Sequence, residues 1–62
     1  MIKCAEIDEY VIMYDRENRV FVIERDGEYV LESIEDSGVE IVRLMSFEFA
    51  ANAIDWIDEN DN

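Results

Sequence analysis

The chain has 62 residues, half of them hydrophobic, and a formal net charge of −12 from 17 acidic and five basic residues. A domain of this length buries only roughly 60% of its unfolded surface, so its stability depends on a dense small core or on a partner subunit. No polar run is long enough to indicate disorder, so residues 1–62 are expected to form a single folded domain. The charge argues against direct binding to nucleic acid or to a membrane, and it favours a basic protein partner.

The longest apolar run, from Tyr10 to Tyr14, is too short to cross a bilayer, and the N-terminus lacks the layout of a signal peptide. We therefore expect a soluble, cytoplasmic protein. The single cysteine, Cys4, cannot form an intrachain disulfide, and without histidine it lacks partners for a thiolate metal site. We expect Cys4 to act as a small hydrophobic residue at a strand edge.

Polar turn sequences divide the first 44 residues into strands. These turns are "DREN" at 15–18, "RDG" at 25–27 and "EDSG" at 35–38. The predicted strands lie near residues 5–14, 19–25, 28–34 and 39–44. The connections hold only two to four residues, which suits antiparallel hairpins and excludes the long crossovers of parallel strands. We predict a four-stranded antiparallel β-meander.

After Met45 the hydrophobic period changes from that of a strand to that of a helix, and Ser46 is the predicted N-cap. The apolar residues that recur at helical spacing are Phe47, Ala50, Ala51, Ile54 and Ile57. Three more apolar residues, Phe49, Ala53 and Trp56, widen this face to over half of the helix circumference. The predicted fold class is therefore α+β, with one C-terminal α-helix packed on one face of the meander.

The predicted elements carry more apolar surface than one helix can cover. Tyr29 and Leu31 share one face of their strand while Val30 and Ile34 share the other, and "VFVI" at 20–23 is apolar on both faces. A single helix covers only one face of a sheet. We therefore predict either a homodimer or a dedicated binding surface.

Acidic residues are unevenly distributed. Residues 1–25 hold six acids and four bases, net −2, whereas residues 26–62 hold eleven acids and one base, Arg43, net −10. Solubility alone does not require this asymmetry. The first acidic cluster comprises Glu28, Glu32, Glu35, Asp36 and Glu40. The second, at the helix end, comprises Asp55, Asp58 and Glu59, and it opposes the helix dipole. Acids placed against stability are typical of functional surfaces, and a general compositional bias is the alternative.

Residues for catalysis are missing from the sequence. Without histidine, the commonest general base is absent. Ser33, Ser37 and Ser46 fit strand, turn and cap positions, and Gly27 and Gly38 stand singly in turns instead of forming a phosphate-binding loop. We predict no enzymatic activity, no catalytic residues and no cofactor.

The C-terminal tail "DWIDENDN" is a candidate metal site. Asp55, Asp58, Glu59 and Asp61 offer the hard oxygen ligands that calcium prefers. Their spacing matches no EF-hand loop, and a solvated helix end accounts for the same residues. No metal is expected.

Carboxylates on a rigid frame can imitate a run of phosphates. Alternate residues on a strand lie about 6.5–7 Å apart, and i, i+4 neighbours on a helix about 5–6 Å, so both elements can hold negative charge at phosphate-like intervals. A protein with this charge pattern would occupy the basic groove of a DNA-binding enzyme. The leading hypothesis is a DNA-mimic inhibitor. The alternative is a small homodimeric adaptor that binds a basic protein without mimicry.

Glu32, Ser33 and Ile34 form the tripeptide Glu-Ser-Ile. This tripeptide resembles the stretch with which phage uracil-DNA glycosylase inhibitors, small acidic sheet-and-helix DNA mimics, enter the DNA groove of their enzyme. In that family apolar residues follow, one of which plugs the pocket for the flipped base, whereas Glu35 and Asp36 follow here. The chain is also similar to small acidic phage proteins of the anti-CRISPR and anti-restriction type. An ordinary strand end is the alternative interpretation of the tripeptide.

Overall fold

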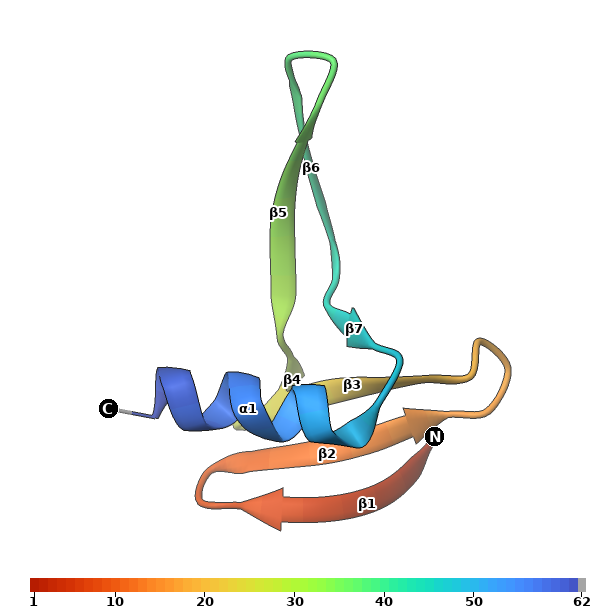
Figure 1. Ribbon diagram of the computed structural model, residues 1–62, viewed down its shortest axis with the longest axis vertical. Helices are drawn as coiled ribbons and strands as arrows, with labels where there is room; N and C mark the ends of the chain where they lie inside the picture. The colour runs from red at the N-terminus through yellow and green to blue at the C-terminus, as the bar shows by residue number, and fades with distance from the viewer. Residues whose placement is uncertain (62) are drawn as a thin grey trace.

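The computed structural model describes residues 1–61, which form seven strands and one helix. In chain order the elements are β1 (Ile2–Ile7), β2 (Tyr10–Asp15), β3 (Val20–Arg25), β4 (Glu28–Tyr29), β5 (Leu31–Asp36), β6 (Val39–Leu44), β7 (Ser46–Phe47) and α1 (Ala50–Asn60). The predicted α+β class is confirmed: β1 to β4 form an antiparallel meander, and the C-terminal helix packs against it (Figure 1).

The fourth strand position of the sheet is divided between two short strands. Both β4 and β7 pair with the edge of β3 that faces away from β2, β4 opposite Glu24 and Arg25 and β7 opposite Phe21 and Val22. Between them, residues 31–44 leave the sheet as the β5–β6 hairpin. This hairpin, hereafter the arm, projects from the body of the molecule (Figure 1).

The predicted strand over 5–14 is in fact two strands. Asp8 and Glu9 form a turn between β1 and β2, with Ile7 and Tyr10 as the flanking pair. Asp8 has a φ of 54°, which an aspartate tolerates better than most residues. The apolar pattern continues on both sides of this short turn, and so it concealed the break.

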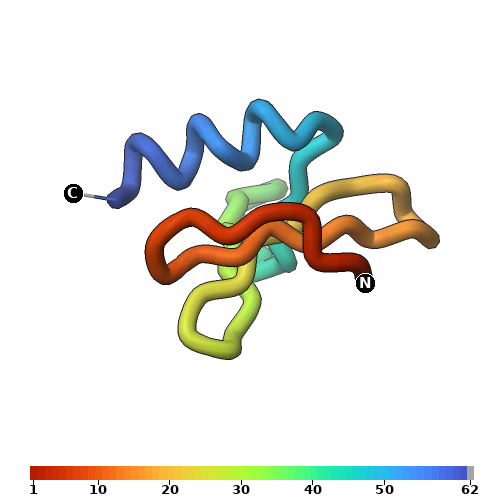
Figure 2. Tube along the Cα trace, turned by 90° about the horizontal axis from the view of Figure 1, so that it is seen from below, coloured from red at the N-terminus to blue at the C-terminus, as the bar shows by residue number. Residues whose placement is uncertain are grey.

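The core lies between α1 and one face of the sheet. The buried side chains in contact with one another are Tyr10, Ile12, Ile23, Met45, Ala53 and Ile57. The ring of Trp56 meets that of Tyr10 edge-on, with centroids 5.9 Å apart and an interplanar angle of 86°. Figure 2 shows the helix on one side of the sheet, and the opposite side carries no helix from residues 1–61.

The helix begins later than predicted. Ser46 is not its N-cap, because α1 starts at Ala50 and Phe49 occupies the cap position without a side-chain hydrogen bond. Ser46 and Phe47 instead form β7, where Phe47 lies opposite Phe21 and is half-buried. Strand pairing and aromatic burial therefore outweigh the capping preference of Ser46.

The buried face of the helix is also displaced from the predicted one. Ala53 and Ile57 are buried and Trp56 is half-buried, whereas Ile54 and Phe49 are 44% and 61% exposed. Because Phe47 lies outside the helix, the predicted stripe loses its first member. The helix and its N-cap residue therefore leave two large apolar side chains, Ile54 and Phe49, exposed to solvent.

Cys4 lies in β1, the edge strand, at the irregularity between Lys3 and Ala5, and its thiol is exposed. Its predicted edge position is thus confirmed, although its side chain is not buried. Across residues 1–61, no helix is long and apolar enough to cross a membrane.

Candidate functional site

The arm is a regular two-stranded ribbon that is fixed to the sheet at its base. Its cross-strand pairs run from Leu31–Leu44 at the base to Asp36–Val39 at the tip. At the base, the amide of Met45 donates to the carbonyl of Val30 at 3.2 Å, and the amide of Val30 donates to the carbonyl of Ile23 at 2.8 Å. Backbone hydrogen bonds therefore connect the arm to β3.

The tip of the arm is a two-residue turn. Ser37 and Gly38 have φ angles of 53° and 79°, the left-handed values that a type I′ turn requires at both central positions. The twist of this turn type matches the twist of paired strands. The sequence signal "EDSG" thus predicted the tip correctly.

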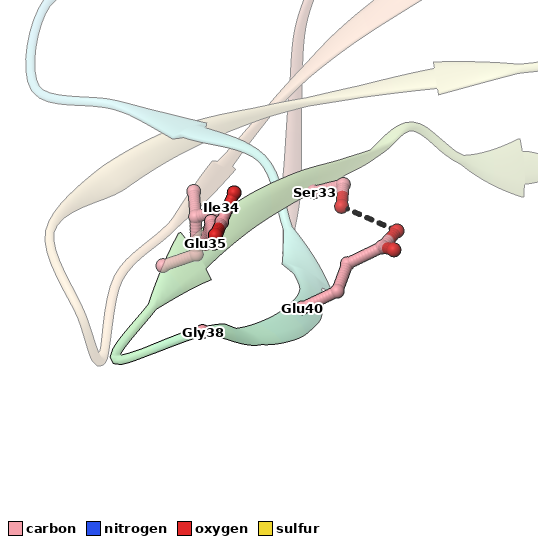
Figure 3. A pocket seen from close by; sticks show the side chains of 5 residues that line it. All are labelled: Ser33, Ile34, Glu35, Gly38 and Glu40. Carbon is pink, nitrogen blue, oxygen red and sulfur yellow. Dashed lines mark hydrogen bonds between the residues drawn. The ribbon is translucent and has the colours of Figure 1, made fainter.

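Three carboxylates lie near the tip without a basic neighbour in residues 33–42. Glu35 and Glu40 are directly opposite each other in the β5–β6 ladder, and Asp36 precedes the turn. The hydroxyl of Ser33 donates to the carboxylate of Glu40 at 2.7 Å and draws this side chain along the ribbon (Figure 3). Directly opposed like charges destabilise a strand pair, so the tip accumulates negative charge at a cost to its own stability.

Glu32 differs from the other acids of the arm because its charge is paired. It lies opposite Arg43, and its Oε2 accepts from the Nε of Arg43 at 2.7 Å. The base of the arm is therefore electrically balanced. The uncompensated charge of the arm is confined to Glu35, Asp36 and Glu40, hereafter the tip acids.

Apolar side chains on the arm are also exposed. The most exposed are Leu31 at 58%, Val39 at 60%, Ile41 at 40% and Val42 at 60%. Because neighbouring strand residues point to opposite faces, these side chains occupy both faces of the ribbon. The arm is thus both acidic and apolar, which is a composition suited to contact with another protein.

A shallow hollow of about 410 Å³ lies beside the tip. It is lined by Ser33, Ile34, Glu35, Gly38 and Glu40 (Figure 3). Two of these residues, Ser33 and Ile34, belong to the Glu-Ser-Ile tripeptide. Nowhere in the described chain do three or more acidic or cysteine side chains gather in a way that could hold a metal ion.

The remaining predicted residues lie away from the arm. Glu28 is on β4 opposite Arg25, within the body of the molecule. The helix acids Asp55, Asp58 and Glu59 are exposed on α1, whose C-terminal end points away from the arm in Figure 1. The structure therefore separates the arm acids from the helix acids, as two clusters on different parts of the surface.

Sequence reasoning missed a second group of neighbouring acids, in which Asp61 at the end of the helix lies near Asp8 and Glu9 of the β1–β2 turn. A hydrogen bond to Asp8 raises the pKa of Asp61, and desolvation and the charges of Asp8 and Glu9 add to this effect, while Arg25 opposes it. Arg25 itself pairs with Glu9 at 3.1 Å and lies 5.3 Å from the centroid of the Tyr10 ring. The signal was hidden because Asp8 and Glu9 were assigned to a strand interior.

These features define a small acidic α+β domain with a projecting β-hairpin as its most distinctive surface. Comparisons of the chain with models of protein families, with curated proteins and with solved structures find no match.

Proposed function

We propose that this protein is a non-enzymatic inhibitor that inserts its arm into the basic DNA-binding groove of a nucleic-acid-processing enzyme. The observation that supports the proposal is the projecting ribbon with the uncompensated tip acids Glu35, Asp36 and Glu40. DNA-binding grooves present Lys and Arg side chains to phosphates, and the tip acids offer these cations an equivalent charge. Steering between opposite charges accelerates such an encounter.

The dimensions of the arm favour this mode of binding. Cross-strand neighbours have Cβ atoms about 4.5–5.5 Å apart, and alternate residues on a strand are about 6.5–7 Å apart. Opposed carboxylates such as Glu35 and Glu40 therefore present a compact array of negative charge. The hydrogen bond from the amide of Val30 to the carbonyl of Ile23 holds the base of the ribbon against β3.

The resemblance of the Glu-Ser-Ile tripeptide also supports an inhibitor that enters a DNA-binding groove. Ser33 and Ile34 line the hollow beside the tip, and Glu32 lies at the base on the same strand. In the phage uracil-DNA glycosylase inhibitors the resembling stretch enters the groove of the enzyme. Here a glycosylase, nuclease, polymerase or CRISPR effector is the class of target proposed.

Capture from a bacterial lysate tests the proposal. The tagged protein is washed at low salt and then exposed to duplex DNA, which is expected to release a DNA-binding enzyme. The matched variants each remove three charges: Glu35→Gln with Asp36→Asn and Glu40→Gln on the arm, or Asp55→Asn with Asp58→Asn and Glu59→Gln on the helix.

The arm variant is expected to lose the captured enzyme and the helix variant to retain it, although both have the same net charge. Capture that survives the arm variant, or that DNA does not reverse, would refute the proposal.

A second candidate is a small adaptor that binds a basic protein without imitating DNA. It is favoured by the exposed apolar side chains Leu31, Val39 and Val42, which a purely electrostatic mimic does not need. Under this alternative, duplex DNA leaves the captured partner in place. Substitution of Val39 and Val42 by Thr then weakens capture more than removal of the tip acids does.

A further inference from the structure

We propose that the outer edge of β6 is a homodimer interface, at which the arms of two copies pair antiparallel about Ile41 and form one four-stranded sheet. An isolated two-stranded ribbon is at best marginally stable in water, and a third strand or a packed helix is normally needed. In the part of the chain that the structure describes, β5 and β6 pair only with each other, and neither face carries a helix (Figure 1). The inference rests on the edge of β6, whereas the proposed function rests on the tip acids.

The hydrogen-bonding groups of β6 alternate between its two edges. The amide of Met45 donates to the carbonyl of Val30, so the backbone N–H and C=O groups of the odd-numbered residues in β6 point toward β5. The same parity follows from the two-residue turn, because the pair that flanks such a turn, Asp36 and Val39, is a hydrogen-bonded pair. The backbone groups of Glu40, Val42 and Leu44 therefore point outward, where no strand of residues 1–61 pairs with them.

The two edges of the arm differ in charge. The β5 strand carries Glu32, Glu35 and Asp36 and no base, and such acids protect an edge against pairing with a copy of itself. The β6 strand, "VEIVRL", carries one base, Arg43, which is paired with Glu32, and one acid, Glu40. With that ion pair set aside, β6 keeps one uncompensated acid and β5 keeps two, Glu35 and Asp36, so electrostatics favour β6 over β5 as the self-pairing edge.

The β6 edge is also the apolar edge. Three of its residues are 40–60% exposed, namely Val39, Ile41 and Val42. A long, apolar and unprotected edge strand is a site of strand addition in natural proteins. A second copy of β6 is an occupant that matches it in length, in polarity and in charge.

Pairing about Ile41 places compatible side chains opposite each other. Ile41 meets Ile41 of the second copy, and because Ile34 lies opposite Ile41 within each arm, four isoleucines form one row across the sheet. Val39 then lies beside the aliphatic part of Arg43 of the second copy. In this register Gly38 at the tip of each arm lies opposite Leu44, at the base of the arm of the second copy.

The charge of −12 on each copy affects this dimer in a predictable way. Antiparallel arms hold the two bodies at opposite ends of the shared sheet, and a strand of six residues spans roughly 20 Å. The Debye length falls from about 10 Å at 0.1 M salt to about 3 Å at 1 M. The dissociation constant of the dimer is therefore expected to fall as NaCl is added.

Disulfide trapping tests the register. In a Cys4→Ser background, Ile41→Cys is compared with Ile34→Cys, the directly opposed residue on the other strand. Across a β6–β6 contact, the two Cα atoms of residue 41 lie about 4.5–5.5 Å apart, within disulfide range, whereas those of residue 34 are about 14 Å apart, three strand spacings.

Under mild oxidation, Ile41→Cys is expected to cross-link several times faster than Ile34→Cys on a non-reducing gel. Faster cross-linking of Ile34→Cys would assign the contact to β5, and equal slow rates would refute the dimer.

Sedimentation equilibrium provides a second test with no new cysteine. The protein is expected to approach twice its chain mass of 7.3 kDa at high concentration. Val42→Pro removes an outward-facing N–H and should leave a monomer, while Ser33→Pro, the same change on the outer edge of β5, should still dimerise. A wild type that remains monomeric at every concentration and salt level would overturn the proposal, as would dissociation caused by Ser33→Pro alone.

Discussion

Replacement of Ile57 by alanine should remove a large part of the stability of the domain. The side chain of Ile57 is 1% exposed and belongs to the core beneath α1. Deletion of a buried isoleucine side chain to alanine costs about 2–5 kcal/mol. At about 0.05–0.15 kcal/mol per residue, a chain of 62 residues has about 3–9 kcal/mol in total. Ile57→Ala should therefore bring the domain close to unfolding.

The matched control is Ile54→Ala on the same helix. Ile54 is 44% exposed, and alanine has the higher helix propensity, so this variant should stay within about 0.5 kcal/mol of the parent. Urea unfolding followed by circular dichroism measures both variants. With a denaturant slope of about 1 kcal/mol/M for so small a domain, Ile57→Ala should lower the midpoint by about 2 M or more. Equal losses in the two variants would mean that the helix docks through another face.

Three further changes test local features. The raised pKa of Asp61, caused first by its hydrogen bond to Asp8, means that the folded protein binds a proton there more tightly than the unfolded chain. Stability from this group therefore rises as pH falls from neutral through the carboxylate range. Asp61→Asn should melt above the parent at neutral pH, and an advantage that does not shrink in acid would contradict the assignment. Glu32→Gln, which weakens the partly exposed pair with Arg43, should cost at most about 1 kcal/mol in thermal melts and less at high salt. Gly38→Ala meets no steric obstacle but strains a residue with φ of 79°, so it should accelerate hydrogen exchange in the arm and leave exchange of the core amides unchanged.

The parts of the fold that follow from local signals were predictable. The turn at Ser37 and Gly38 and the change of hydrophobic period after Met45 predicted the β5–β6 hairpin and the helix. The departure of the arm from the sheet has no such signal, because valine is a strand-forming residue type and neither glycine nor proline stands beside Val30. Only the competition of two strands for the same edge of β3 determines where the chain leaves, and this competition depends on tertiary pairing.

The candidate site was also predictable only in part. The acidic composition of residues 28–40 predicted an acidic surface there, but strand alternation could not reveal that Arg43 neutralises Glu32. That pairing depends on the cross-strand register, which the turn length fixes only when the turn is known to hold two residues. The cluster of Asp8 with Asp61 joins residues far apart in the sequence and required the packed helix.

Because β4 and β7 together complete the sheet along β3, the arm between them can be exchanged without altering the sheet. Every buried side chain of the core lies outside residues 31–44 in the described chain. The entry and exit of the arm, Val30 and Met45, are already hydrogen-bonded neighbours, so a hairpin of another length or sequence can start from the same two residues. Natural variation can therefore change the length and the sequence of the arm while the body that carries it keeps its packing.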